Sequence, residues 1–303
     1  MFTVIPAKNG RIIMDKHKKG VIYIIASAFC FALMNLFIRL TGDVPTLQKC
    51  FFRNVFALMI AAASLVKAGV PFRPGKGNVK YMVIRSLTGG LGMMCNFYAV
   101  DHMDISDASM LNKLSPFFAV VFSALLLNEK ANKYEWGAVI CAFIGMLFVV
   151  RPSFDIKVIP ALAGVAGGLG AGIAYTFVRK LGTRGENSMI VVAFFSGFTT
   201  MLLLPNMLFN YKPMTPIQWM FLVLTGLAAA GGQIGITSAY ACAPAKEISV
   251  YDFSIVIFAA IFGFMFLGQI PDLLSVVGYF IIIGTALLKW YYTVIRPAKA
   301  ENT

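Results

Sequence analysis

The chain has 303 residues, of which 59% are hydrophobic and 13% are charged. Soluble domains carry about 25% charged residues, so this composition excludes an ordinary water-soluble globular protein. The net charge of +13 does not indicate nucleic-acid binding, because the basic residues sit mainly in short connections and leave no basic face exposed to solvent.

Apolar runs of about 18 to 23 residues recur along the whole chain, which is the length that an α-helix needs to cross a membrane. Each run is bounded by a short polar segment. The pattern predicts an all-α integral membrane protein with ten transmembrane helices. These helices are expected over residues 20–39, 46–66, 79–99, 105–127, 134–150, 159–178, 188–208, 217–240, 248–267 and 273–293.

The first run follows a basic segment that resembles the start of a secretory signal peptide. Its apolar part, Gly20 to Ile38, is too long for a signal-peptide core. Arg39 follows it, where a cleavage site would need small residues. We therefore expect a retained first helix that comes after a cytoplasmic segment of residues 1–19.

The charges of the connections predict the orientation of the chain in the membrane. If the N-terminus is cytoplasmic, basic connections such as those with Lys76, Lys130 and Arg184 fall on the cytoplasmic side, and few fall on the other. Because lysine and arginine are retained on that side, we expect both termini inside, with residues 294–303 as a cytoplasmic tail. The predicted location is the cytoplasmic (inner) membrane, which the chain crosses many times.

The chain resembles itself at a constant shift of 140 residues, which pairs Arg39 with Arg179 and Gly92 with Gly232. The shift divides it into two predicted five-helix repeats. Because five is odd, the second repeat enters the membrane from the opposite side, so the halves are inverted. Inverted halves can pack in two mirror-related ways, which predicts a transporter with alternating access. The predicted repeats cover residues 20–153 and 154–293.

Ionisable residues inside a predicted membrane helix cost at least about 2.5 kcal/mol near its centre, so they indicate function. Lys113 precedes Pro116, which cannot donate a hydrogen bond to the carbonyl of Asn112, so a kink is expected there. We expect Lys113 to contact the substrate. The alternatives are that it extends to the membrane surface or pairs with Asp107.

Three further ionisable residues lie within predicted helices. Arg85 and Arg53 lie near enough to helix ends either to contact substrate or to bond to carbonyl groups and acidic neighbours. Asp252 is equivalent to Asn112 under the repeat. It could bind a substrate amine, pair with Lys113 across the repeat interface, or exchange a proton.

Uncharged polar residues on the first, third, sixth and eighth predicted helices form the expected lining of a central site, although each could instead bond to a neighbouring helix. Asn35 and Tyr175 are equivalent under the repeat, as expected for groups that face each other across its axis. The expected substrate-binding residues are Lys113, Arg85, Asn96, Tyr98, Asn35, Tyr175, Gln233, Thr237, Tyr240 and Asp252. The expected hinge or gating residues are Pro116, Asn112, Arg39 and Arg179.

Glycines recur at every fourth position in Gly164, Gly168 and Gly172, which predicts a helix face that a neighbouring backbone approaches closely. No dinucleotide-binding fingerprint follows a strand, and the five cysteines have no metal-ligand spacing. We therefore expect no metal site, no cofactor and no enzymatic activity.

Several motifs together carry a family resemblance. They are Phe52-Arg53-Asn54, Arg85-Ser86 followed by Gly89, Leu114-Ser115-Pro116-Phe117, and Leu125-Leu126-Leu127-Asn128-Glu129. With these motifs the chain resembles the EamA-type members of the drug/metabolite transporter superfamily over nearly its whole length. The resemblance implies a ten-helix transporter with a central cavity. The second half departs from the family pattern, with Gln269 in place of a glutamate and Val256 in place of a common proline.

The favoured hypothesis is a secondary active transporter of a small polar or zwitterionic metabolite, such as an amino acid or derivative, in which Lys113 and Arg85 meet a carboxylate. An anionic metabolite is the alternative, because cations outnumber carboxylates inside the predicted helices. A membrane-embedded transferase is a remote third hypothesis, since it would need paired carboxylates. The expected partners are a small-molecule substrate, the lipid bilayer and protons as coupling ion, with no nucleic acid.

Overall fold

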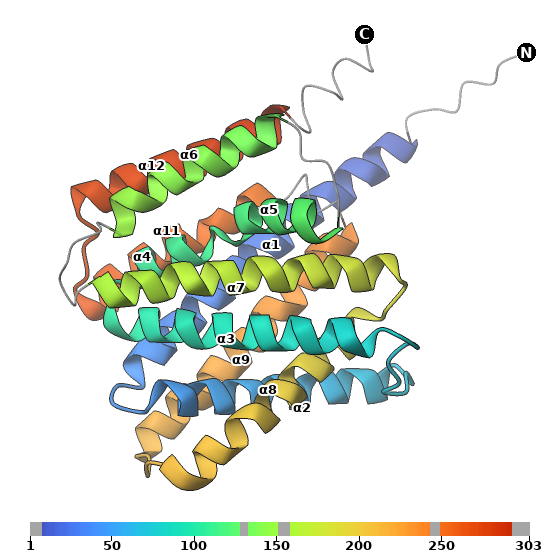
Figure 1. Ribbon diagram of the computed structural model, residues 1–303, viewed down its shortest axis with the longest axis vertical. Coiled ribbons are helices and arrows are strands. Elements are labelled where there is room, and N and C mark those ends of the chain that lie inside the picture. The colour runs from blue at the N-terminus through green and yellow to red at the C-terminus, as the bar shows by residue number, and fades with distance from the viewer. Residues whose placement is uncertain (1–7, 128–132, 151–157, 243–248, 293–303) are drawn as a thin grey trace, which may run out of the picture.

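Helices make up all the regular secondary structure of the computed structural model in the residues it describes, which are 8–127, 133–150, 158–242 and 249–292. Figure 1 shows them arranged as a bundle. The first half contains α1 (Lys8–Leu40), α2 (Thr46–Lys67), α3 (Val79–His102), α4 (Ile105–Asn112), α5 (Ser115–Leu127) and α6 (Lys133–Val150). The second contains α7 (Val158–Thr183), α8 (Ser188–Asn210), α9 (Pro216–Cys242), the 3₁₀-helix η1 (Ser249–Phe253), α11 (Ser254–Leu267) and α12 (Leu273–Trp290).

Length and composition make seven helical segments of the described chain suitable for crossing a membrane, so the multi-pass character of the protein is confirmed. The predicted spans at 79–99, 134–150 and 248–267 are not among these seven and remain predictions. The first helix begins at Lys8, inside the segment predicted as a cytoplasmic N-terminus. Lysine and arginine favour helices, so the basic residues before the apolar run extend this helix.

The packing partners of the helices follow the repeat. The repeat makes α1 equivalent to α7 and α3 equivalent to α9. The packed pair α1 and α9 therefore corresponds to the packed pair α7 and α3. In the same way α3 with α8 corresponds to α9 with α2, while α2 with α8 and α6 with α12 correspond to themselves. Figure 1 shows α6 beside α12 and α3 beside α7. All these strong pairings join one half to the other, so neither half forms a separate bundle.

Glycines bring these paired helices into backbone contact. A Cβ added at Gly170 of α7 would lie 2.7 Å from the carbonyl oxygen of Thr88 and 2.8 Å from Cα of Gly92, both in α3. The predicted glycine face of α7 packs against the fourth predicted helix, since a Cβ at Gly168 would lie 2.7 Å from the carbonyl oxygen of Leu111. The prediction of close helix packing is therefore confirmed.

The fourth predicted helix is interrupted between α4 and α5, immediately before Pro116. Lys113 follows the last residue of α4, and the amide of Leu114 donates to the carbonyl of Leu111 at 3.2 Å, a three-residue step. Pro116 lies in the first turn of α5, where its missing amide hydrogen leaves no bond unmade. The expected kink is thus a full break in the α-helix.

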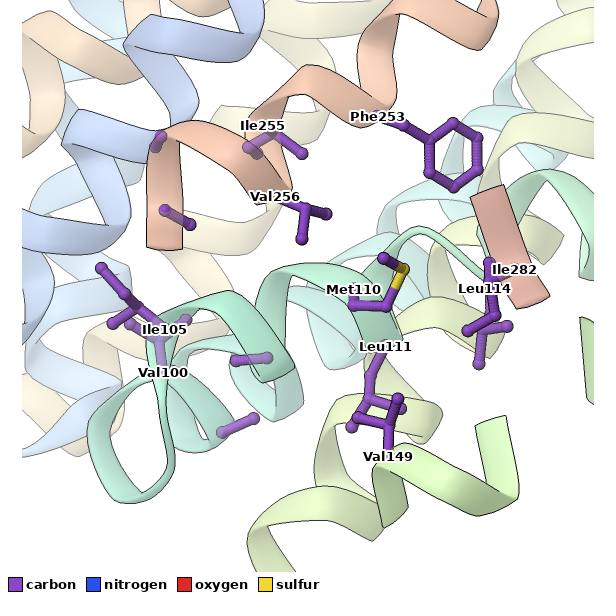
Figure 2. Close-up of a cluster of buried hydrophobic side chains, with 14 of the residues drawn as sticks. Val100, Ile105, Met110, Leu111, Leu114, Val149, Phe253, Ile255, Val256 and Ile282 are labelled. Atoms are coloured by element: carbon purple, nitrogen blue, oxygen red, sulfur yellow. The ribbon is translucent and has the colours of Figure 1, made fainter. Parts of the chain in front are cut away.

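The ninth predicted helix changes from 3₁₀ to α at the equivalent place, although Val256 replaces the proline there, and we call this junction a break as well. The 3₁₀-helix η1 ends at Phe253 and α11 begins at Ser254. A core of buried apolar side chains surrounds both breaks, and Figure 2 shows how residues from α4, η1, α11 and α12 meet in it. Its labelled members include Leu111, Leu114, Phe253, Val256 and Ile282.

We predict that Gly170→Ala destabilises the protein, because the added methyl group would overlap the backbone of α3. Overpacking of this kind costs about 1–3 kcal/mol. The apparent melting temperature of the purified protein in detergent measures the effect. The matched control is Gly284→Ala in α12, where an added Cβ meets nothing within 4 Å. Equal melting temperatures for the two variants would contradict the close crossing.

Candidate functional site

A cavity of about 610 Å³ lies between helices of the two halves. Ligand sites in proteins enclose about 300–1,000 Å³, so this volume suits a small organic molecule. Its lining comes from α1, α2, α3, α4, α7, α8, α9, η1 and α11. Of the expected substrate-binding residues, the structure brings together Asn35, Arg85, Asn96, Lys113, Tyr175, Gln233 and Asp252.

An ion pair between Lys113 and Asp252 crosses the cavity from one half to the other. Lys113 follows α4 and Asp252 lies in η1, so each sits beside the break in its helix. The ammonium of Lys113 donates to Oδ2 of Asp252, and the two side chains are 12% and 15% exposed. The other carboxylate oxygen, Oδ1, is buried without a hydrogen-bond partner. Asp107, the alternative partner of Lys113, accepts a hydrogen bond from the hydroxyl of Tyr279 instead.

Arg85 and Arg53 bring two further cations to the cavity wall. The guanidinium of Arg85 lies over the ring of Phe195, 3.7 Å from its centroid, and its Nε and Nη1 have no hydrogen-bond partner. Arg53 donates through Nη1 to the side-chain oxygen of Asn54 at 3.3 Å, while its Nε has no partner. Neither arginine takes part in an ion pair between described residues.

Polar acceptors line another part of the cavity. Asn35 donates through Nδ2 to the hydroxyl of Ser109 at 3.1 Å, and Ser109 donates to the carbonyl of Ile105 at 2.6 Å. These bonds fix the amide of Asn35 and leave its Oδ1 without a partner. Oδ1 of Asn96 is also buried without one. The amide oxygens therefore present acceptors to a bound molecule.

Other predicted site residues lie elsewhere or outside the described part of the structure. Tyr98 is not among the lining residues, because its ring stacks on His102 at 4.1 Å between centroids, near the end of α3. Arg39 donates to the carbonyl of Val100 at 3.1 Å. Of the gating residues, Asn112 lines the cavity and Pro116 is exposed. The side chains of Thr237, Tyr240 and Arg179 lie outside the described set.

Several lining residues gave no signal in the sequence. Phe195 is one aromatic residue inside a long apolar run, and nothing in that run distinguishes it. Glu186 follows α7 in a connection, and its carboxylate accepts bonds from the side chain of Asn78 at 2.6 Å and the amide of Gly75 at 3.0 Å. Its sequence neighbourhood resembled an ordinary solvated loop, so only the fold placed it at the cavity.

The cavity reaches one end of the bundle, which we call the mouth end. Its lining there includes Ser64 near the end of α2, Gly182 near the end of α7, Glu186, and Met189 near the start of α8. At the opposite end, where α1 ends and α2 begins, the lining stops at Asn35 of α1 and Arg53 of α2. We call it the closed end.

Polar contacts fasten the closed end. Lys49 is 1% exposed, and its ammonium lies 2.6 Å from Asp101 and 3.0 Å from the carbonyl of Ile38, so it joins α1, α2 and α3. Burial raises the pKa of the Asp101 carboxyl, and the Lys49 ammonium acts in the opposite direction. Burial likewise raises the pKa of Asp104.

Uncharged bonds join the two halves at the closed end. The side chain of Gln48 bonds to the backbone of Lys212 in both directions, at 2.9 and 3.0 Å. Gln218 of α9 donates to the carbonyl of Thr41 at 3.3 Å. Bonds therefore join the halves at the closed end and also at the mouth end, through Glu186 with Asn78 and Gly75, but the cavity extends only toward the mouth end.

Comparison with known proteins gives a family match over most of the chain. Residues 18–151 and 158–290 each match the model of the EamA-like transporter family. The pseudopaline exporter CntI of Pseudomonas aeruginosa (strain UCBPP-PA14) is 27% identical over 275 residues, which cover 90% of this chain and 96% of the exporter. Human solute carrier family 35 member G1 is 26% identical, covering 90% of this chain and 80% of the relative.

A riboflavin transporter of Brucella anthropi is 26% identical to this chain, with 87% of the chain and 95% of the relative covered. A solved crystal structure matches with a TM-score of 0.59 and 18% identity, covering 87% of this chain and 96% of its own. At that identity the likeness shows the fold alone.

We predict that Lys49→Met lowers the stability of the protein strongly, because it leaves Asp101 buried without its counter-ion. Removing one partner of a buried pair costs about 3–5 kcal/mol. The apparent melting temperature in detergent reports the loss. Lys67→Met, at an exposed lysine of the same helix, is the control. If both variants melt at the same temperature, the Lys49 pair does not hold the closed end together.

Proposed function

The chain belongs to the EamA-like transporter family, and from this premise we propose that it is a secondary active transporter of a small polar or zwitterionic metabolite. The observation that carries the proposal is the cavity between the halves, which contains an ion pair beside the two helix breaks and extends to one end of the bundle. A cavity with access from one end fits one state of alternating access.

Transport of a small molecule is also what the names of several relatives state. One is a pseudopaline exporter and another is a riboflavin transporter. These names differ in cargo and support the activity without giving the substrate of this chain. Family membership favours a transporter over a membrane-embedded transferase.

We further propose that ten helices cross the cytoplasmic membrane in two inverted repeats with both termini inside. The correspondence of packed helix pairs under the repeat supports this arrangement. The basic connections after the second and sixth predicted helices support it as well. In this topology the mouth end faces the cytoplasm and the closed end faces outward, so the structure corresponds to an inward-open state.

The ion pair of Lys113 with Asp252 has the placement expected of a switch between the two states. Under the 140-residue shift its equivalent would be Phe253 with Asn112, which cannot form an ion pair. The pair therefore stabilises one arrangement of the halves without an equal counterpart in the other. The carboxylate of this pair makes protons the candidate coupling ion.

An anionic metabolite is a second candidate cargo. It is supported by Arg53 and Arg85, which bring positive charge to the wall without a carboxylate partner among the described residues. The two candidates differ in whether the substrate must also carry a hydrogen-bond-donating group such as an ammonium.

The proposed switch can be tested without knowing the substrate. In a background with its native cysteines replaced, Gln218→Cys places a reporter thiol at the closed end. We expect Lys113→Met to increase its labelling by a membrane-impermeant maleimide in intact cells, because the pair that favours the inward-open state is lost. Lys67→Met is the control and should leave labelling unchanged. Unaltered labelling in the Lys113 variant would exclude the switch.

The proposed orientation has its own test. In the same background, Asp43→Cys should react with the impermeant maleimide in intact cells, because its connection is expected outside. Lys76→Cys should react only after the membrane is permeabilised. Both positions are exposed in the structure, so the reverse pattern would mean that the orientation is inverted.

A further inference from the structure

Two unpaired arginines mark one part of the cavity as a site for an anionic group. A guanidinium taken out of water needs an acceptor for its N–H groups, since an unpaired buried charge is strongly unfavourable. Nε and Nη1 of Arg85 and Nε of Arg53 have none. The two charges repel each other, and both residues line the cavity together with Tyr175. A carboxylate between them would satisfy the free donors.

The surroundings of Arg85 hold its guanidinium toward the centre of the cavity. Phe195 stacks against its face at 3.7 Å, which leaves the N–H edge free for a planar acceptor. A Cβ added at Gly89 would lie 3.6 Å from Nη1. The side chain of Arg85 therefore extends one turn along α3 to the level of Gly89, in the direction of Asn96.

Lys113, by contrast, is already neutralised. Its ammonium donates to Asp252, so a substrate carboxylate would have to displace an existing carboxylate to bind there. The sequence favoured Lys113 as the main contact for a carboxylate. The geometry transfers that role to Arg85 and Arg53.

The acceptors near the ion pair have the opposite chemistry. Oδ1 atoms of Asn35, Asn96 and Asp252 are buried without a hydrogen-bond partner, and all three residues line the same cavity as the arginines. Acceptor oxygens call for a donor on the bound molecule, and an ammonium or hydroxyl group supplies one. The free donors of Arg85 therefore lie at one level of the cavity and these acceptors at another, while Arg53 lies near the closed-end limit of the lining, as Asn35 does.

The spacing of these levels sets a minimum length for the ligand. Seven residues separate Gly89 from Asn96, which is about 10 Å along a helix. Two hydrogen bonds of about 2.9 Å account for part of that span, so the ends of the ligand must be about 5 Å apart or more. The ammonium and carboxylate of a simple α-amino acid are only about 3 Å apart, too close to reach both levels.

We propose that the cavity binds an extended amino-carboxylate, with its carboxylate on Arg85, where Arg53 adds positive charge, and its donor end on Asn35, Asn96 and Asp252. The inference rests on the proposed transport function and narrows its substrate class from amino acids to longer derivatives. It also fixes the direction of the bound molecule, with the anionic end nearer the mouth end.

The experiment measures binding to the purified full-length protein in lipid nanodiscs, by isothermal titration and by thermal shift. The probes are 6-aminohexanoate, 6-aminohexanamide without the anionic charge, hexanoate without the amine, and glycine without the length. We expect 6-aminohexanoate to bind and to raise the melting temperature by mass action. Each of the other three probes should bind about 10- to 100-fold more weakly, because each loses a charged hydrogen bond.

Variants assign the contact. Arg85→Met and Arg53→Met should abolish the preference for 6-aminohexanoate over 6-aminohexanamide, whereas Arg73→Met, at an exposed arginine, should keep it. If the Arg85→Met protein fails to fold, Arg85→Lys is the second variant. It should retain only part of the preference, because an ammonium lacks the planar edge of a guanidinium. The comparison of probes on the unmodified protein needs no variant.

Three results would overturn the proposal: no preference for 6-aminohexanoate over its amide, equal binding of glycine, or a preference that survives in both arginine variants. Transport is measured separately, by exchange of labelled 6-aminohexanoate in proteoliposomes. Binding with the expected preferences but without exchange would refute the proposed function and leave the site assignment standing. Exchange with no dependence on Arg85 or Arg53 would do the reverse.

Discussion

Charge that is buried in a membrane bundle must be neutralised inside the fold, and the bond between Lys113 and Asp252 meets this requirement where both halves are interrupted. Interrupted helices leave backbone groups unpaired, and these are tolerated at membrane depth only where protein or a cavity surrounds them. The apolar core around the breaks and the cavity beside them provide both surroundings. The ion pair, the breaks and the cavity are therefore parts of one arrangement.

The repeat explains the framework of this arrangement but not its chemistry. Packed helix pairs correspond to one another under the repeat throughout the described bundle. The charged residues do not follow the repeat, because Lys113, Arg85 and Arg53 correspond to Phe253, Thr225 and Ala193. The cations thus come from the first half, and the carboxylate that pairs with Lys113 comes from the second. A symmetric scaffold with asymmetric charges can hold a polar molecule in one direction only.

Physical cost decides which features could be predicted from the sequence. Apolar run length predicted the helices, and the expense of a buried charge singled out Lys113 and Asp252, whose pairing was one of several alternatives. The role of Lys49 could not be predicted, because its partner Asp101 is distant in the chain and only the packing of α2 on α3 buries them together. Phe195 was hidden for a different reason, since an aromatic residue in an apolar run resembles every other lipid or core contact. The break before α11 lacked its proline signal.

The contacts at the closed end indicate where the two halves can separate. The charged contact there, Lys49 with Asp101, joins helices of one half, so an outward opening between halves would leave it intact. Apart from the bond that the Asp107 carboxylate of α4 accepts from the Tyr279 hydroxyl of α12, the bonds described at this end that cross between halves are uncharged, from Gln48 and Gln218 to backbone groups and from the amide of Ile105 to Gln269. Each such bond contributes only about 1 kcal/mol net. A glutamate in place of Gln269 would accept that amide bond with a full charge and strengthen it. The glutamine thus keeps this contact between the halves weaker than a glutamate would.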